Sequence, residues 1–481
     1  MTTPAASAPP PPLLTFRGGL AGALLPFVVF LAGVGWLGLS GAPDERGFWP
    51  VLVAALTVGL LITHDKRRFI ETMLAGMARP LVMLMVMAWS LAGILSALLG
   101  ASGFIQALVW IARWAGLAGG GYVAGAFLVC AVVATSTGTS LGTILICGPL
   151  LYPAGAAVGA APAMLIGAIL AGATFGDSIS PISDTTIASA GTQGADIGGV
   201  VRARAKYVLP AGLVMLVAAV LFGGGGQIPA SIAASATPGD PRGLPMLAVP
   251  VVVISLLLAR RHLLEGLLAG SLVALAIALP LGLIRPDQLL RIDPGSFAAR
   301  SLVIDGIERS LGVVMFTLLL VGLVSTVEAT GALGRLVAFV RGRAASRRSA
   351  EFWIVGAVTG AVLLTTHSVV AILTVGEFAR ETGLRVGIGP YRRANLLDVT
   401  VCTWPFTLPY FLPAILAANA TAAGAPFGMP RVSPLATGVH NIYSWALLGM
   451  VVLAVVAGYG RSEGPSDDAS VHPSSGLKTG S

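Results

Sequence analysis

The sequence predicts an all-α polytopic membrane protein with about 11–13 hydrophobic segments. Hydrophobic residues make up 56% of the chain and charged residues only 10%, and the mean hydropathy is +0.88. One soluble core cannot bury that much apolar surface. Uncharged apolar runs also recur along most of the chain, and about 20 residues are enough to cross a bilayer core. Most of the chain is therefore expected to lie in a membrane.

The expected spans follow one another from residue 19 to residue 460. Pro, Gly and Thr interrupt several of them, and we expect two or three to be broken or re-entrant. Irregular backbone at membrane depth must be surrounded by protein or by a watery cavity, so such breaks indicate an internal site. The spans are 19–41, 48–63, 80–99, 122–150, 157–175, 207–225, 244–259, 266–284, 311–330, 352–376, 396–418 and 441–460.

An internal repeat divides the chain into two halves. The run 81–109 resembles 313–337, and in each half a hydroxyl-rich stretch and then an acidic segment with a proline follow. Such duplicated order is typical of membrane carriers. The expected domains are a disordered N-terminal tail at 1–18, a first transmembrane repeat at 19–226, a linker at 227–243, a second repeat at 244–460 and a disordered C-terminal tail at 461–481.

Basic residues predict that the two repeats have inverted topology. Cytoplasmic loops are enriched in Lys and Arg, and the basic clusters lie in opposite loops of the two halves. One segment conflicts with this reading, because counting spans places residues 380–393 outside. Either a re-entrant element has been counted as a span or the inversion is wrong. The residues concerned are Lys66, Arg67, Arg68, Arg79, Arg202, Arg204 and Lys206 in the first half, and Arg335, Arg341, Arg343, Arg347, Arg348, Arg380, Arg385, Arg392 and Arg393 in the second.

Charge and cysteine content limit the classes of partner. The formal net charge of +8 resides mainly in loops between spans, where it reports topology, so we expect a lipid bilayer and no nucleic acid as partner. Cys130, Cys147 and Cys402 lie in apolar runs and show neither disulfide nor metal-ligand spacing. We expect no cofactor. A homo-oligomer is compatible with the sequence.

Acidic and hydroxyl side chains inside apolar runs form the candidate site. Asp177 and Asp184 lie in the segment 174–186, and an ionisable group at membrane depth is costly and usually functional. Structural readings remain open, because Asp184 can cap a helix and Thr or Ser can bond a preceding carbonyl. The candidate residues for ion or substrate binding are Asp177, Ser180, Asp184, Thr185, Thr137, Thr139, Ser140, His367 and Asp398.

The same segment carries a family resemblance. Residues 176–186 read Gly-Asp-Ser-Ile-Ser-Pro-Ile-Ser-Asp-Thr-Thr, which resembles the Gly-Asp-Lys-x-Ser-Pro-Leu-Ser-Asp-Thr-Thr signature of the NhaC family of sodium/proton antiporters. The order of elements is similar over residues 20–460. Ser178 and Ile187 depart from the family pattern, which commonly has Lys and Asn there. The resemblance implies a secondary active transporter of Na⁺ and H⁺ in the bacterial inner membrane, crossing it several times, with Asp177 and Asp184 binding the transported sodium.

Three hypotheses follow. In the first, sodium and a proton compete for Asp177 during alternating access, and His367, with an unperturbed pKa near ~6.5, senses pH. In the second, the same scaffold is a sodium- or proton-coupled carrier of a small organic acid or amino acid, with Arg392 or Arg393 adding charge. The third, a membrane enzyme using Asp177, Asp184 and His367, has no nucleophile or metal motif in its favour. We therefore expect a transporter and no enzyme.

Overall fold

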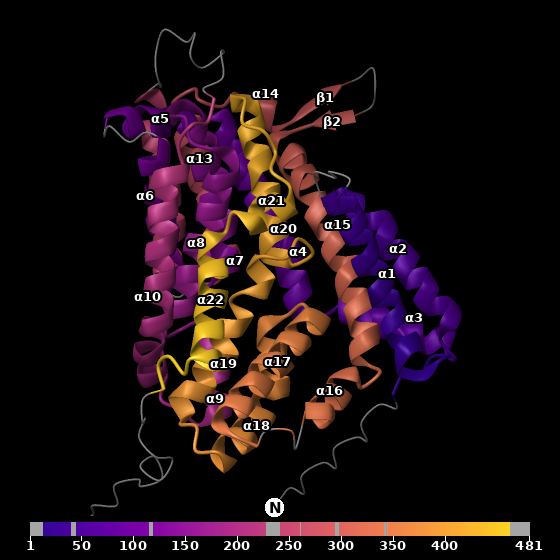
Figure 1. Ribbon diagram of the computed structural model, residues 1–481. Helices are drawn as coiled ribbons and strands as arrows, with labels where there is room; N and C mark the ends of the chain where they lie inside the picture. Colours follow the sequence, from indigo (N-terminus) through magenta and orange to yellow (C-terminus); the bar gives the residue numbers. More distant parts are fainter. Residues whose placement is uncertain are drawn as a thin grey trace, which may run out of the picture.

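The structure is an almost entirely helical, multi-pass membrane protein (Figure 1). The computed structural model describes residues 13–39, 45–114, 119–227, 241–259, 261–293, 298–340, 343 and 345–461. Within these ranges, seven helices are long and apolar enough to cross a membrane, and five shorter apolar helices accompany them. Their sheet content is one antiparallel hairpin, β1 (Arg291–Asp293) with β2 (Ala298–Arg300), in which Arg291 pairs with Arg300. The predicted fold class is confirmed.

The helices fall into two sets on either side of the 227–243 segment. The first set is α1 (Gly19–Leu39), α2 (Phe48–Ile62), α3 (Lys66–Met77), α4 (Pro80–Ala101), α5 (Phe104–Trp114), α6 (Gly119–Thr137), α7 (Ser140–Ala154), α8 (Pro162–Ile179), α9 (Asp184–Gln193) and α10 (Ile197–Phe222). The second set is α12 (Ala248–Leu258), α13 (Leu263–Ala278), α14 (Pro286–Leu289), α15 (Leu302–Glu328), α16 (Ala332–Val340), α17 (Arg347–Thr365), α18 (Ser368–Arg385), α19 (Pro390–Val401), α20 (Leu412–Ala420), α21 (Pro434–Val439) and α22 (Ile442–Val456).

Three runs predicted as single spans are interrupted. The run 122–150 is divided at Gly138, whose φ is +68°, and the run 352–376 is divided at Thr366, whose φ is +54°. Left-handed backbone ends an α-helix, because it cannot continue the i→i−4 hydrogen bonds. The run 396–418 is divided by residues 402–411, which contain a short 3₁₀ turn at Trp404–Phe406. The expectation that two or three spans are broken or re-entrant is confirmed, and these three runs are the broken ones.

Two of the interrupted runs double back as helical hairpins. The Tyr122 hydroxyl near the start of α6 donates to the Leu151 carbonyl near the end of α7, at 2.7 Å. In the second half the Arg347 Nε at the start of α17 donates to the Val386 carbonyl just after α18, at 2.9 Å. Each pair is therefore antiparallel, and its tip is the break between the two helices.

The second hairpin bears on the conflict in charge topology. Because α17 and α18 form a hairpin, the segment 380–393 lies at the same end of the molecule as Arg347, which favours the explanation that a re-entrant element has been counted as a span. Figure 1 shows α3, α9, α16 and α18 toward one end, with α5 and α14 toward the other. The end with α3 carries the basic clusters, and the positive-inside rule predicts that it faces the cytoplasm.

The two halves carry the same order of elements. In each half a long helix is followed by a left-handed glycine and an amphipathic helix, with Gly103 between α4 and α5 and Gly331 between α15 and α16. A helical hairpin and a broken helix follow in both halves. Figure 1 shows α5 and α16 at opposite ends. The inverted relationship between the repeats stays a prediction, and this arrangement favours it.

Close helix packing depends on glycine at specific positions. Helix α8 packs along α6, and a Cβ on Gly172 would lie 2.3 Å from the Phe127 carbonyl oxygen and 2.8 Å from the Cys130 Cβ, both on α6. Backbone cannot move aside cheaply, so only glycine permits this approach. Small residues that let helix backbones meet are a common device in membrane helix packing.

We expect Gly172→Ala to lower the free energy of unfolding by about 1–3 kcal/mol, the usual cost of overpacking. Gly125→Ala on α6 is the matched control, because a Cβ there meets nothing within 4 Å and alanine favours the helix. Thermal unfolding of the two detergent-solubilised variants compares them. Equal unfolding temperatures would contradict the assigned α6–α8 contact.

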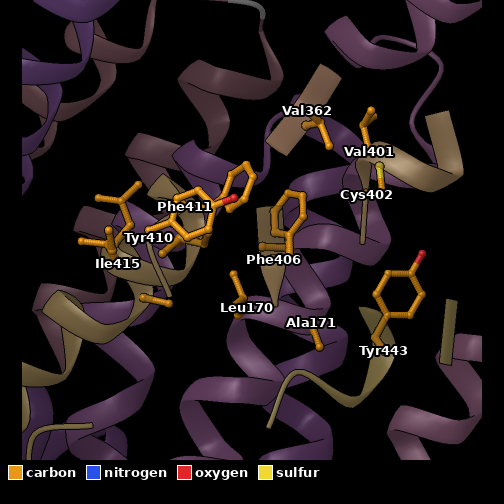
Figure 2. Packing of buried hydrophobic residues seen from close by; sticks show 14 of the residues in the cluster. Leu170, Ala171, Val362, Val401, Cys402, Phe406, Tyr410, Phe411, Ile415 and Tyr443 are labelled. Carbon is orange, nitrogen blue, oxygen red and sulfur yellow. The ribbon is translucent and has the colours of Figure 1, made fainter. Parts of the chain in front are cut away.

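A buried core surrounds the interrupted helices (Figure 2). Side chains from α8, α17, α20 and α22 meet those of the 402–411 break. Phe411 and Tyr443 are fully enclosed, and Tyr410 stacks near Phe411 with ring centroids 4.5 Å apart. The irregular backbone of the break is thus packed in protein, as backbone at membrane depth must be.

The predicted tails and linker are only partly within the described residues. In the tail expected at 1–18, Leu14 and Phe16 are buried, and Phe16 forms an isolated bridge with Thr63, so these two side chains pack into the folded core. Residues 1–12, most of the 227–243 linker and residues 462–481 lie outside the described residues. Arg461 is described and pairs with Glu351 at 2.6 Å.

Candidate functional site

A cavity of about 310 Å³ lies where the helix breaks of both halves meet. One wall comes from the unbroken helix α4, through Leu84, Met85, Ala88 and Trp89, and Leu263 of α13 closes another side. The hairpin tips and the breaks supply its polar lining, which comprises Gly138, Thr139, Ser140, Asp177, Asp184, Thr185, Thr366, His367, Ser368 and Cys402. Segments far apart in the sequence therefore share one pocket.

Asp177 supplies to this cavity a carboxylate with one unpartnered oxygen. It lies in the last turn of α8, its side chain is 5% exposed, and its Oδ1 atom is buried with no hydrogen-bond partner among the described residues. The helix stops at Ile179 because Pro181, two residues further on, has no backbone N–H to donate. A buried carboxylate oxygen without a partner is costly, so it favours a bound cation or proton.

Asp184 is the first residue of α9, on the far side of the same break. Its Oδ1 accepts a hydrogen bond from the Thr185 N–H at 2.8 Å, and a carboxylate at a helix N-terminus is stabilised by the helix dipole. The Thr185 hydroxyl lies 3.0 Å from the Ser183 hydroxyl. The N-cap position of α9 is held by Ser183, so the capping reading of Asp184 is wrong, and its carboxylate lines the cavity from the first turn of the helix.

The hydroxyl candidates divide into two groups. Thr139 and Ser140 line the cavity, and Thr139 also caps α7 by accepting from the Gly142 N–H at 3.2 Å. Thr137 and Ser180 are absent from the described lining. The Thr137 hydroxyl donates to the Val133 carbonyl at 2.8 Å, and the Ser180 hydroxyl donates to the Thr135 carbonyl at 2.8 Å. The first bond lies within α6, and the second joins the break after α8 to the end of α6.

His367 is the N-cap residue of α18 and forms the tip of the second hairpin. It lines the cavity, and its Nδ1 atom is buried without a hydrogen-bond partner in the described part of the chain. The preceding residue, Thr366, holds a left-handed conformation that is uncommon for a β-branched side chain. Such strain is often found at functional sites.

Asp398 does not line the cavity, which corrects its expected place in the site. Its Oδ2 atom pairs with Arg204 Nη2 at 2.6 Å, and both side chains are fully buried. The Ser189 hydroxyl donates to the same oxygen at 3.0 Å, and the Cys402 thiol donates to Oδ1 at 3.4 Å. The carboxylate is thus already compensated by charge within the protein.

Sequence reasoning missed Arg204, which it assigned to a loop. Helix α10 begins at Ile197, ten residues before the predicted span at 207, so Arg204 lies inside a helix. The signal was present, because Asp196 caps this helix by accepting from the Gly199 N–H at 2.7 Å. An Asp followed by a continuous helical run predicts a helix start.

The described lining of the cavity favours a cation. It holds two carboxylates and one imidazole, and among its described members there is no Lys or Arg. Arg392 and Arg393, the candidates for binding an anionic substrate, are bonded to other groups. Arg392 Nε pairs with buried Glu351 at 3.0 Å, and Arg393 Nε donates to the Gln193 side-chain oxygen at 3.0 Å. No cluster of three or more His, Cys, Asp or Glu residues suited to a bound metal occurs within the described ranges.

Substitution of the left-handed residue at each hairpin tip, Gly138 or Thr366, is expected to affect folding in opposite ways. A Cβ on Gly138 would lie 2.8 Å from Ile182 Cγ1 and 2.9 Å from the Ile182 carbonyl oxygen, so Gly138→Thr is expected to prevent normal folding. Thr366→Gly removes an unfavourable left-handed side chain and is expected to stay within about 1 kcal/mol of the parent protein. Size-exclusion profiles after membrane extraction test both, and similar loss in the two variants would contradict the assigned tip geometries.

Comparisons with known proteins agree on one class. A family model described as the Na⁺/H⁺ antiporter family matches residues 25–224. The malate-2H⁺/Na⁺-lactate antiporter of Bacillus subtilis is 35% identical over 95 residues, which are 20% of each chain. The Na⁺/H⁺ antiporter NhaC of Alkalihalophilus pseudofirmus is 33% identical over 96 residues, and that of Bacillus subtilis 35% over 97, each match covering 20% of this chain and 21% of the relative. The chain thus matches about a fifth of each relative's length.

Proposed function

We propose that this chain, whose residues 25–224 match a model of the Na⁺/H⁺ antiporter family, is a secondary transporter that exchanges sodium for protons. One observation carries the proposal: Asp177 presents a buried, unpartnered carboxylate oxygen to a cavity whose described lining has no Lys or Arg. A carboxylate in this setting attracts a small cation or a proton.

Competition at Asp177 couples the two ions. With its carboxylate ionised, Asp177 binds sodium together with Asp184 and the hydroxyls of Thr139, Ser140 and Thr185, which are hard oxygen ligands. Protonation neutralises the carboxylate and releases the ion. Because one carboxylate serves both ions, their binding is mutually exclusive.

Alternating access moves this site between the two faces of the membrane. Both halves contribute a hairpin tip and a helix break to the cavity, as inverted-repeat carriers require. A change in the packing of the broken helices against α4 and α13 opens the cavity to one side at a time. His367, with an unpartnered Nδ1 in the same cavity, provides a second group for proton binding.

A second candidate is a sodium- or proton-coupled carrier of a small organic acid. The cavity of about 310 Å³ is larger than one dehydrated cation needs, given that a water molecule takes about 30 Å³. Helices α7, α9, α18 and α20 also begin at the breaks around the cavity. The positive end of the helix dipole at a helix N-terminus stabilises a bound carboxylate. One of the similar proteins is named for malate and lactate exchange.

Ion pulses on everted vesicles separate the two candidates. Vesicles that contain the protein are acidified inside, and a pH-sensitive dye is read after pulses of sodium, lithium or potassium and then of organic acids. We expect sodium alone to dissipate the pH gradient, relative to vesicles without the protein. A response only to an organic acid would favour the carrier, and no response to either class would reject both.

A further inference from the structure

Arg204 lies at the centre of a second, fully buried polar site beside the first. Its guanidinium meets four oxygen atoms from α8, α9 and α19, and its side chain is 0% exposed. The four partners are Asp398 Oδ2 at 2.6 Å, the Ser178 carbonyl at 2.7 Å, the Thr186 hydroxyl at 2.8 Å and the Asn395 side-chain oxygen at 2.9 Å.

These four oxygens are the kinds of ligand that a sodium ion takes. A carboxylate, a backbone carbonyl, a hydroxyl and an amide carbonyl are hard donors that replace the water around such a cation. Arginine fills the same space with a permanent positive charge, since its guanidinium stays protonated in proteins.

Asp398 holds the same position in the second half as Asp177 holds in the first. Asp177 lies in the last turn of α8, and Asp398 lies in the last turn of α19. Each helix is the first part of a broken pair, and a proline follows in each break, at Pro181 and Pro405. Asp177 is open to the cavity, whereas Asp398 is neutralised by Arg204.

The site around Arg204 is next to the cavity. Cys402 lines the cavity, and its thiol donates to Asp398 Oδ1 at 3.4 Å. A single side chain therefore separates the second carboxylate from the space in which the transported ion would move.

We propose that Arg204 occupies the place of a second sodium ion, as a built-in cation bound to Asp398, so that each chain binds one sodium, at Asp177. This inference rests on the proposed function for the role of Asp177, and it concerns the number of ions bound. It predicts that removing the arginine side chain uncovers a sodium site. A purely structural ion pair predicts no such response.

Sodium-dependent stability tests this directly. The variants are Asp177→Asn, which removes the first carboxylate, and Asp177→Asn/Arg204→Ser, which also empties the second site. Each full-length protein is extracted and its thermal unfolding followed at equal concentrations of sodium chloride and choline chloride, because an ion that binds the folded state raises the unfolding temperature. We expect sodium to raise it by several degrees in the double variant and to leave Asp177→Asn unchanged.

Two further variants make the response specific. Asp177→Asn/Arg204→Ser/Asp398→Asn removes the second carboxylate and is expected to lose the sodium response. Asp177→Asn/Arg204→Lys keeps a cation in place and is expected to fold equally well in both salts. If the double variant is recovered only in sodium, the proposal is supported, whereas its failure in both salts overturns it.

The outcomes for the two sites are independent. A wild-type protein without a sodium response would count against sodium binding at Asp177 and leave the test at Arg204 intact. A double variant that responds equally to choline, or that responds to sodium no more than Asp177→Asn does, would overturn the assignment of Arg204 as the built-in cation.

Discussion

Asp177→Asn is expected to abolish sodium/proton exchange while the protein still inserts and folds. The substitution keeps the shape of the side chain and removes both the negative charge and the site of proton exchange. Because the carboxylate is buried with no partner on Oδ1, its loss relieves a desolvation cost, and stability is expected to stay equal or rise. Exchange is measured in everted vesicles by the pH response to sodium, which is expected to fall to the level of vesicles without the protein.

Asp196→Asn is the matched control for this experiment. Asp196 is exposed, caps α10 and lies outside the described lining of the cavity, and asparagine is an equally good N-cap. Exchange by this variant should equal that of the parent protein. Near-normal exchange by Asp177→Asn, at equal amounts of inserted protein, would reject the assignment of the shared carboxylate.

Breaking the Arg204–Asp398 pair is expected to have the largest effect on stability. Asp398→Asn leaves the guanidinium buried without its counter-ion, and removal of one partner from a buried pair costs about 3–5 kcal/mol. Arg204→Met with Asp398→Leu removes both charges together and is expected to recover most of this loss. The unfolding temperature of the extracted proteins, measured without sodium, compares the single and double variants.

Glu328→Gln provides the reference for an exposed ion pair. Glu328 pairs with Arg79 at 2.7 Å, but these side chains are 19% and 46% exposed, so the expected loss is at most about 1 kcal/mol. If Asp398→Asn destabilises the protein no more than Glu328→Gln does, the central position given to Arg204 is wrong. A double variant that is no more stable than Asp398→Asn would contradict the electrostatic explanation.

Several features of this protein follow from local sequence. Hydropathy alone predicts the membrane class, because about 20 apolar residues in a row have no other stable environment. The residues of 174–186 predict a break at membrane depth, since Pro181 cannot donate and Asp177 is too costly to leave in lipid. The structure places Asp177, Asp184, Thr139, Ser140, Thr185 and His367 in one cavity, a juxtaposition that the repeated order of elements had favoured.

Other features depended on contacts that no local pattern contains. Thr137, Gly138 and Thr139 carry no charge and lie between apolar runs, so a hydropathy average continues the span across them. It does not detect the hairpin turn at Gly138. The sequence by itself determined the membrane class and the acidic break. Only the tertiary structure decided which carboxylate is open to the cavity, because the charge of Asp398 is neutralised by a guanidinium from a helix in the other half of the chain, and such pairing is set by packing in space.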